Sequence, residues 1–312
     1  MYFPLLRAKQ FELLAVREVS SIISKKLVSP IIEPTKADTT QLIKAVNTFV
    51  LNNINFTLIL NSCIVNVGCM NSISELIKSY LKTYSNFQIG INVTENLDFE
   101  KLSEFIEINH LEEYFFSLIH LQKPNDINKM NTFIKDYNVK YNVIHIENVK
   151  SRYKRNFDAD SCISMNDSFN QQQRNADYIS YPDELFSEEF LYYKDEGFIG
   201  FCDYLTIGER FSDSGFTPYV VVIHLTYLKG KEIRIAHFSS KSKKDTNSPL
   251  DLPKKFKEAL DALLLFVDSN NITLTKAISE FKDLKVRDHF PGLGIIKKLS
   301  IMNHLELVSN LI

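Results

Sequence analysis

The sequence lacks the hallmarks of several common protein classes. Its four cysteines form no C-x-x-C pair, which excludes a zinc ribbon. The longest apolar run near its end, Leu260–Val267, is interrupted by Asp261 and is far too short to span a bilayer. The first residues show no basic region followed by an apolar run, so we expect no signal peptide and a cytoplasmic protein. A net charge of −2 gives no overall bias toward nucleic acid or membranes.

What the chain does contain is a regular alternation of strand-like and helix-like segments. Short apolar runs bounded by turn signals recur roughly every 27 residues in the first half. Between them, apolar residues lie three and four positions apart, as in amphipathic helices. Six such units favour parallel strands with helical crossovers, and we predict an α/β fold, a single TIM-like (β/α)8 barrel over residues 1–312. The six runs are Phe3–Leu6, Pro30–Ile32, Phe56–Leu60, Phe87–Ile91, Tyr114–Ile119 and Tyr141–Ile146.

The regular pattern ends after the sixth run. Residues 148–196 are polar and free of glycine, and we interpret them as a long insertion after the sixth strand. The insertion is either a solvated loop or a lid over the barrel mouth, since it follows the carboxyl end of a strand. We predict Gly197–Asp203 as the seventh strand and Tyr219–Leu225 as the eighth, the latter paired with Ile233–Phe238 in a hairpin. The barrel is then irregular at its C-terminal end, and helices within residues 253–312 complete the chain.

Polar residues follow the apolar strands directly. In a barrel, the carboxyl ends of all strands meet at one rim, so these side chains would converge there. A lysine, carboxylates and a histidine in one mouth are suited to binding a phosphate or a divalent metal, or to acid–base chemistry. The alternative is that strand ends meet solvent and carry polar residues for that reason alone. The residues are Lys9, Glu33, Asn61, Asn92, His120, Glu147 and Asp203.

Two smaller sets within this group point to specific chemistry. Lys9 and Glu33 follow adjacent strands, so they form either a structural ion pair or a site with a nucleophilic lysine. Asp203 with His224 and His237 is our preferred set for a metal or for acid–base catalysis. Its mixture of histidine and carboxylate suits Mn, Fe or Zn better than Ca.

Two charged segments lie outside the strand ends. Within residues 148–196, Arg174 and Asp177 belong to a dense polar run, and Arg174 would reach a phosphate from a lid. The segment Lys241–Lys244 is locally basic, which is suited to nucleic-acid backbone but equally typical of a solvated loop. A solvated turn explains the run around Arg174 equally well.

Several blocks of the sequence resemble a known family. They resemble the bacteriophage beta-protein family, specifically its uncharacterised bacterial relatives, the sce seventy-seven twenty-five family. The resemblance implies a phage-defence or mobile-element gene pair in which the partner is the nuclease-like product of an adjacent gene. It assigns no catalytic residue. The blocks are Tyr2 to Glu12, Pro30 to Glu33, Gln173 to Tyr178, Gly197 to Tyr204 with Ile207 and Gly208, Pro218 with Ile223 to Tyr227, His237 with Phe238, and Pro291 to Gly294 with Lys297 to Ser300.

Three functions follow from these observations. The first is a barrel that binds a phosphate-bearing ligand, such as a small molecule or nucleic acid, or its partner protein, at the strand carboxyl face. The second is a metal-dependent hydrolase, most plausibly a phosphodiesterase, with a divalent metal as cofactor. The third is a barrel that serves only as a scaffold. For these functions we predict the catalytic residues Lys9, Glu33, Asp203 and His224, the ligand-binding residues Asn61, His120, Arg174 and Asp177, and the metal ligands Asp203 and His237.

Overall fold

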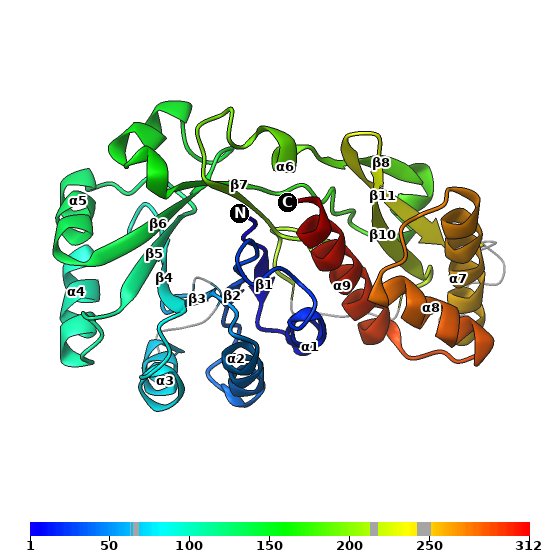
Figure 1. Cartoon of the computed structure of the whole chain (residues 1–312), viewed down its shortest axis with the longest axis horizontal. Helices are drawn as coiled ribbons and strands as arrows, with labels where there is room; N and C mark the ends of the chain where they lie inside the picture. The colour runs from blue at the N-terminus through cyan, green and yellow to red at the C-terminus, as the bar shows by residue number, and fades with distance from the viewer. Residues whose placement is uncertain (63, 65–68, 213–217, 242–250) are drawn as a thin grey trace.

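The computed structural model describes residues 1–62, 64, 69–212, 218–241 and 251–312. Figure 1 shows a barrel on one side and a small antiparallel sheet with two helices on the other. One long helix, α9 (Leu293–Leu311), lies between the two parts. No helix within the described ranges is both long and apolar enough to cross a membrane.

The barrel consists of parallel strands in chain order, which confirms the predicted TIM-like fold class. It nearly closes at its beginning, where Tyr2 forms parallel bridges to both Val28 and Phe201. The Phe3 amide also donates to the Phe201 carbonyl at 2.8 Å. The strands are β1 (Leu5–Arg7), β2 (Ile31–Glu33), β3 (Phe56–Ile59), β4 (Phe87–Val93), β5 (Phe115–His120), β6 (Asn138–His145), β7 (Cys162–Asn166) and β9 (Gly200–Asp203).

Helices cover the outside of the first strands. Every residue of β4 is buried, because this strand packs against side chains inside the barrel and against helices outside it. Two of the helices begin at an aspartate that accepts a backbone bond, Asp98 from Lys101 and Asp126 from Lys129. These helices are α1 (Gln10–Val19), α2 (Thr40–Asn52), α3 (Cys69–Leu76), which continues as a π-helix η1 (Ile77–Leu81), α4 (Phe99–Ile108) and α5 (Ile127–Asp136).

The seventh and eighth strands differ from the prediction. The seventh strand is β7, which lies inside the segment 148–196 that we interpreted as an insertion. The segment that we expected as the seventh strand supplies the eighth, β9. Strand β7 was not predicted because its apolar run is short and follows two polar 3₁₀ helices, η2 (Ser151–Asn156) and η3 (Ala159–Ser161).

The predicted eighth strand belongs to a separate antiparallel sheet. The hairpin of β10 (Val222–Lys229) and β11 (Glu232–Ser239) is confirmed, but neither strand joins the barrel. Strand β8 (Asp183–Ser187) pairs with β11 from the other side. Between β7 and β9 also lie η4 (Asn175–Ser180) and α6 (Glu189–Tyr192), while α7 (Leu252–Ser269) packs on the hairpin and α8 (Lys276–Val286) packs beside α7.

Helix α9 joins the two parts, because it packs on α1 of the barrel and on β10 of the sheet. Residues 298–305 are all buried, as expected of a helix covered on every side. Near its start, a Cβ on Gly294 would lie 2.0 Å from Phe11 Cε2 of α1. The glycine therefore permits the close approach of the two helices.

A buried polar network connects the barrel, helix α9 and the antiparallel sheet. Asp203, at the end of β9, accepts a bond from the Tyr2 hydroxyl at 2.7 Å and lies 3.2 Å from His304 Nε2 of α9. The other nitrogen of His304 lies 3.1 Å from the Thr226 hydroxyl of β10. Because these groups are buried, each depends on its partners for the hydrogen bonds that water would otherwise supply. Asp203 thus faces α9 and fixes it to the barrel.

We predict that Asp203→Ala lowers the free energy of unfolding by about 3 kcal/mol, because it leaves the Tyr2 hydroxyl and His304 Nε2 without a partner in the interior. Urea unfolding of wild type and variant measures this difference. The matched control is Asp268→Ala, which removes an exposed ion pair with Lys282 and should cost about 0.5 kcal/mol. Equal losses in the two variants would contradict the assigned role of Asp203.

Candidate functional site

The mouth of the barrel is occupied by its own polar side chains. Arg7 Nε lies 3.2 Å from Glu33 Oε2, and both side chains are buried. The other oxygen of Glu33 accepts bonds from Asn92 Nδ2 at 2.9 Å and from the Ser62 hydroxyl at 3.2 Å. Arg7 also donates to the Glu209 carbonyl at 2.7 Å, so the loop after β9 lies over the strand ends. Glu33 is therefore part of a closed network.

Lys9 does not pair with Glu33 as the spacing suggested. Its ammonium group donates to the Ser212 carbonyl and lies 4.3 Å from the ring centroid of Phe211. Arg7 takes the place beside Glu33, because it is the last residue of β1 whereas Lys9 is already the N-cap of α1. Lys9 instead lines a cavity beside the rim.

Three other predicted residues at strand ends do not line the cavity that Lys9 lines. Asn61 accepts from the Asn92 amide at 2.7 Å and donates to its carbonyl at 2.9 Å, so it holds β3 to β4. His120 is fully buried, donates to Asn142 Oδ1 at 3.1 Å and accepts from the Tyr153 hydroxyl at 3.0 Å. Burial lowers the pKa of His120 to about 4. Glu147 is exposed at the end of β6.

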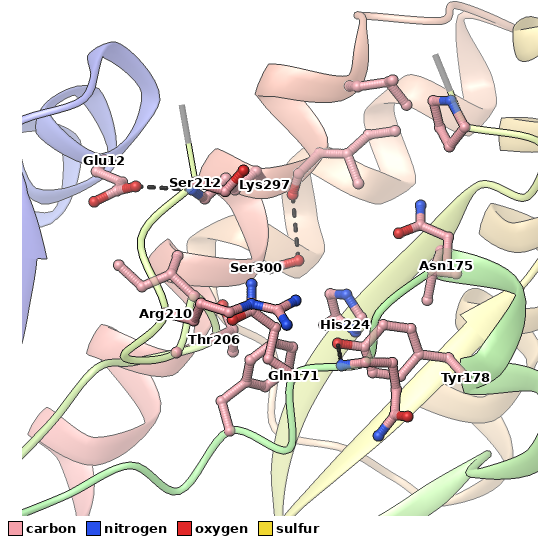
Figure 2. A pocket seen from close by; sticks show the side chains of 18 of the residues that line it. Glu12, Gln171, Asn175, Tyr178, Thr206, Arg210, Ser212, His224, Lys297 and Ser300 are labelled. Carbon is pink, nitrogen blue, oxygen red and sulfur yellow. Dashed lines mark hydrogen bonds and ion pairs between the residues drawn. The ribbon is translucent and has the colours of Figure 1, made fainter. Parts of the chain in front are cut away.

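The cavity lies beside the barrel rim and has a volume of about 490 Å³. Barrel residues after β1 and β9 form one side of it, and residues of β10 and η4 form the opposite side. Helix α9 contributes Lys297 and Ser300 between them. Figure 2 shows Glu12 and Lys297 on one side, Tyr178, Asn175 and His224 on the other, and Arg210 between the two groups.

The cavity wall carries more positive than negative charge. Lys297 forms an ion pair of 2.7 Å with Glu12, which is buried and is the one carboxylate among the described lining residues. Arg210 has no ion-pair or hydrogen-bond partner among the described residues, and its guanidinium extends into the cavity (Figure 2). With Lys9 also on the wall, an anion is the ligand that this charge pattern favours.

The loop after β9 fixes the position of Arg210. The amide of the preceding residue, Glu209, donates to Asp167 Oδ2 at 2.8 Å, and its carbonyl accepts from Arg7. One residue earlier, Gly208 adopts a φ of 74°, which favours glycine. The backbone is thus held on both sides at Glu209, so the Arg210 side chain starts from a fixed point.

Aromatic and amide side chains form the opposite wall. The Tyr178 hydroxyl accepts from the Gln172 amide at 3.0 Å, and its ring stacks with Phe169 at 6.1 Å between centroids. Asn175 donates to the Val220 carbonyl at 2.9 Å. Flat rings and amides beside cations are features of sites for nucleotides and other phosphate compounds with a ring.

Arg174 and Asp177 hold this wall from the outside. Arg174 Nη2 lies 2.9 Å from Asp177 Oδ1, and Asp177 Oδ2 accepts from the Arg174 backbone amide at 3.1 Å at the start of η4. Neither lines the cavity, although their neighbours Gln173 and Asn175 do. The pair therefore orients η4. Neither side chain is placed to contact a ligand in the cavity.

His224 and His237 face each other across the hairpin. Their Nδ1 atoms are 2.7 Å apart, and His237 Nε2 lies 3.2 Å from Glu184 Oε1 of β8. Desolvation lowers the pKa of both histidines, and for His224 the neighbouring His237 lowers it further. His224 is partly exposed and lines the cavity, whereas His237 is buried behind it. Of the pair, only His224 is placed to meet a ligand.

The predicted metal ligands are not assembled into one site. Asp203 is bound to Tyr2 and His304, whereas His237 is bound to Glu184 and His224. Within the described ranges, no three histidine, cysteine, aspartate or glutamate side chains form a group that would hold a metal ion. The basic segment Lys241–Lys244 lies outside the described residues apart from Lys241.

Comparison with known proteins adds no assignment. No protein-family model, curated protein or solved structure matches this chain. The resemblance to the beta-protein family thus stays a prediction.

Arg210 and Lys297 are site residues that were not predicted from the sequence. Arg210 lies seven positions after Asp203 in the loop that follows the last barrel strand, so a search extended along that loop would have included it. No local signal marks Lys297, because its place in the cavity depends on how α9 packs against α1.

We predict that His120 weakens the fold as the pH falls. Its folded-state pKa of about 4 lies below the ordinary value of 6.5, so the unfolded chain binds the proton more readily. Stability from this group is complete above pH 6.5 and falls by about 2 kcal/mol by pH 5. Urea unfolding at pH 7.5 and 5 measures it, with His120→Gln showing a smaller loss. An NMR titration that places the pKa of His120 near 6.5 would contradict this prediction.

Proposed function

We propose that this protein binds a phosphate-bearing ligand in the cavity beside the barrel rim. Arg210 carries the proposal, since its guanidinium extends into the cavity and has no partner among the described residues. A guanidinium matches the oxygens of a phosphate with two parallel hydrogen bonds. Lys9 and Lys297 add positive charge on the same wall.

The remaining wall supports a ligand that carries a ring as well as a phosphate. Phe169 and Tyr178 offer aromatic faces, and the side-chain amide oxygens of Gln172 and Asn175 offer acceptors. A nucleotide combines both features within the size of a 490 Å³ cavity. The proposal therefore narrows the ligand to a small phosphate compound, with a mononucleotide or dinucleotide as the best fit.

The resemblance to the beta-protein family supplies the biological setting of the proposal. It points to a defence-related gene pair, in which the ligand-bound barrel would act with the product of the adjacent gene. Copurification of the two gene products, with and without added nucleotide, tests this part separately from ligand binding. The alternative, a metal-dependent phosphodiesterase, has less support because the described residues supply no three-ligand group for a metal.

We predict that Arg210→Gln weakens binding of pyrophosphate and of ADP by at least tenfold. The substitution keeps a polar side chain that is shorter and uncharged, and it removes a charge-assisted bond of about 1.5–3 kcal/mol. Isothermal titration calorimetry of both probes measures the change. The matched control is Arg155→Gln in η2, an exposed arginine that does not line the cavity.

Two results would overturn the proposal. One is a wild-type protein that binds neither probe at millimolar concentration. The other is equal affinity in wild type and Arg210→Gln, which would place any bound anion elsewhere. If pyrophosphate binds as tightly as ADP, the phosphate alone is recognised and the ring wall is not used.

A further inference from the structure

A chain of three side chains in the antiparallel sheet leads to the wall of the cavity. Glu184 Oε2 accepts from Asn170 Nδ2 at 2.9 Å, and its Oε1 lies 3.2 Å from His237 Nε2. His237 Nδ1 in turn lies 2.7 Å from His224 Nδ1. The carboxylate is thus held by a bond of its own, and the two rings follow in a fixed order toward the cavity.

The order of these contacts determines which nitrogen carries each proton. An ionised carboxylate only accepts, so His237 donates from Nε2 to Glu184. In a neutral ring the other nitrogen, Nδ1, is then an acceptor, and His224 must donate to it from its own Nδ1. His224 Nε2 is therefore left without a proton, and it has no hydrogen-bond partner among the described residues.

We propose that His224 is a general base that activates water for hydrolysis of a phosphate ester bound in the cavity. This inference rests on the proposed function, because it needs the phosphate to lie beside Arg210. His237 and Glu184 are positioning residues, which orient the ring and stabilise the imidazolium that forms. Tyr178 packs edge-on against His224 at 4.7 Å between centroids and limits rotation of the ring.

In the proposed hydrolysis, one bond to phosphorus forms as another breaks. Water gives one proton to His224 Nε2 while its oxygen forms a bond to phosphorus. The bond from phosphorus to the ester oxygen breaks on the side opposite the attacking water, and that oxygen leaves with the electron pair and takes a proton from solvent, while the imidazolium returns its proton to solvent. One ester and one water thus become one phosphate and one alcohol, and His224 returns to its neutral form. The cations Arg210, Lys9 and Lys297 stabilise the charge on the phosphoryl oxygens.

The surroundings of His224 suit a base that works with an anionic ligand. In the free protein, desolvation and His237 keep its pKa well below 6.5, so the ring is unprotonated at neutral pH. The negative charge of a bound phosphate raises that pKa toward the working pH, where a general base is most effective. Glu184 acts in the same direction through His237, while the positive charge of Arg210 acts in the opposite one.

The test measures hydrolysis of p-nitrophenyl phosphate and bis(p-nitrophenyl) phosphate in the presence of EDTA, together with pyrophosphate affinity of the same samples. We expect wild type to turn over at least one of the two esters. His224→Gln should lower kcat by at least 100-fold and leave pyrophosphate affinity within about threefold. His289→Gln, which changes an exposed histidine outside this cavity, is the matched control and should leave kcat unchanged.

Glu184→Gln is the second variant, and it tests the positioning role. It keeps an acceptor for His237 but removes the charge, so kcat should fall about tenfold and the midpoint of the pH–rate profile should move to lower pH. A residue that only supports the fold would leave that midpoint in place.

Each part of the proposal has an outcome that overturns it. Wild type that binds pyrophosphate but hydrolyses neither ester overturns catalysis and leaves the binding function standing. Wild type that binds neither pyrophosphate nor ADP overturns the proposed function as well. Turnover that EDTA abolishes, or that survives in His224→Gln, removes His224 from the role of base.

Discussion

The packing of helix α9 is the constraint on which the rest of the structure depends. This helix fits between α1 of the barrel and β10 of the antiparallel sheet, and both contacts bury it. Lys298, itself buried, forms ion pairs with Glu18 of α1 at 3.0 Å and Glu280 of α8 at 3.1 Å, so the same helix ties α8 to the barrel. Without α9 in this place, the sheet would have no fixed position relative to the barrel, and the cavity between them would not exist.

This arrangement moves the candidate site away from the usual place in a barrel. The strand ends are filled by the buried pair of Arg7 and Glu33 and by the loop that carries Glu209. The accessible space lies one step outward, where that loop presents Arg210 to a wall built from the antiparallel sheet. The barrel thus contributes most of the cations, and the sheet contributes His224 and its partners. A ligand in the cavity would contact both the barrel and the antiparallel sheet, which are built from segments far apart in the chain.

The sequence predicted the fold class and the first six barrel strands, but not the last two strands or most of the site. The regular spacing of apolar runs predicts the strands from Phe3–Leu6 to Tyr141–Ile146, because each run lies between turn signals. Strand β7 escaped prediction since its short run, Cys162–Asn166, lies among polar residues. Of the site, Lys9 and His224 were predicted, and the structure places both on the cavity wall; their catalytic roles stay predictions. Arg210 lies in the loop that follows the last barrel strand, beyond the residue directly at the strand end, whereas the place of Lys297 depends on packing between α9 and α1, which are far apart in the chain.

The central claim is that the cavity between barrel, α9 and sheet holds a phosphate group at Arg210. A crystal of the protein soaked with tungstate, a phosphate analogue with a strong anomalous signal, tests it most directly. We expect an anomalous peak within hydrogen-bond distance of the Arg210 guanidinium, on the side that faces His224. A cavity without a peak, in crystals that bind tungstate elsewhere and leave Arg210 open to solvent, would contradict the account.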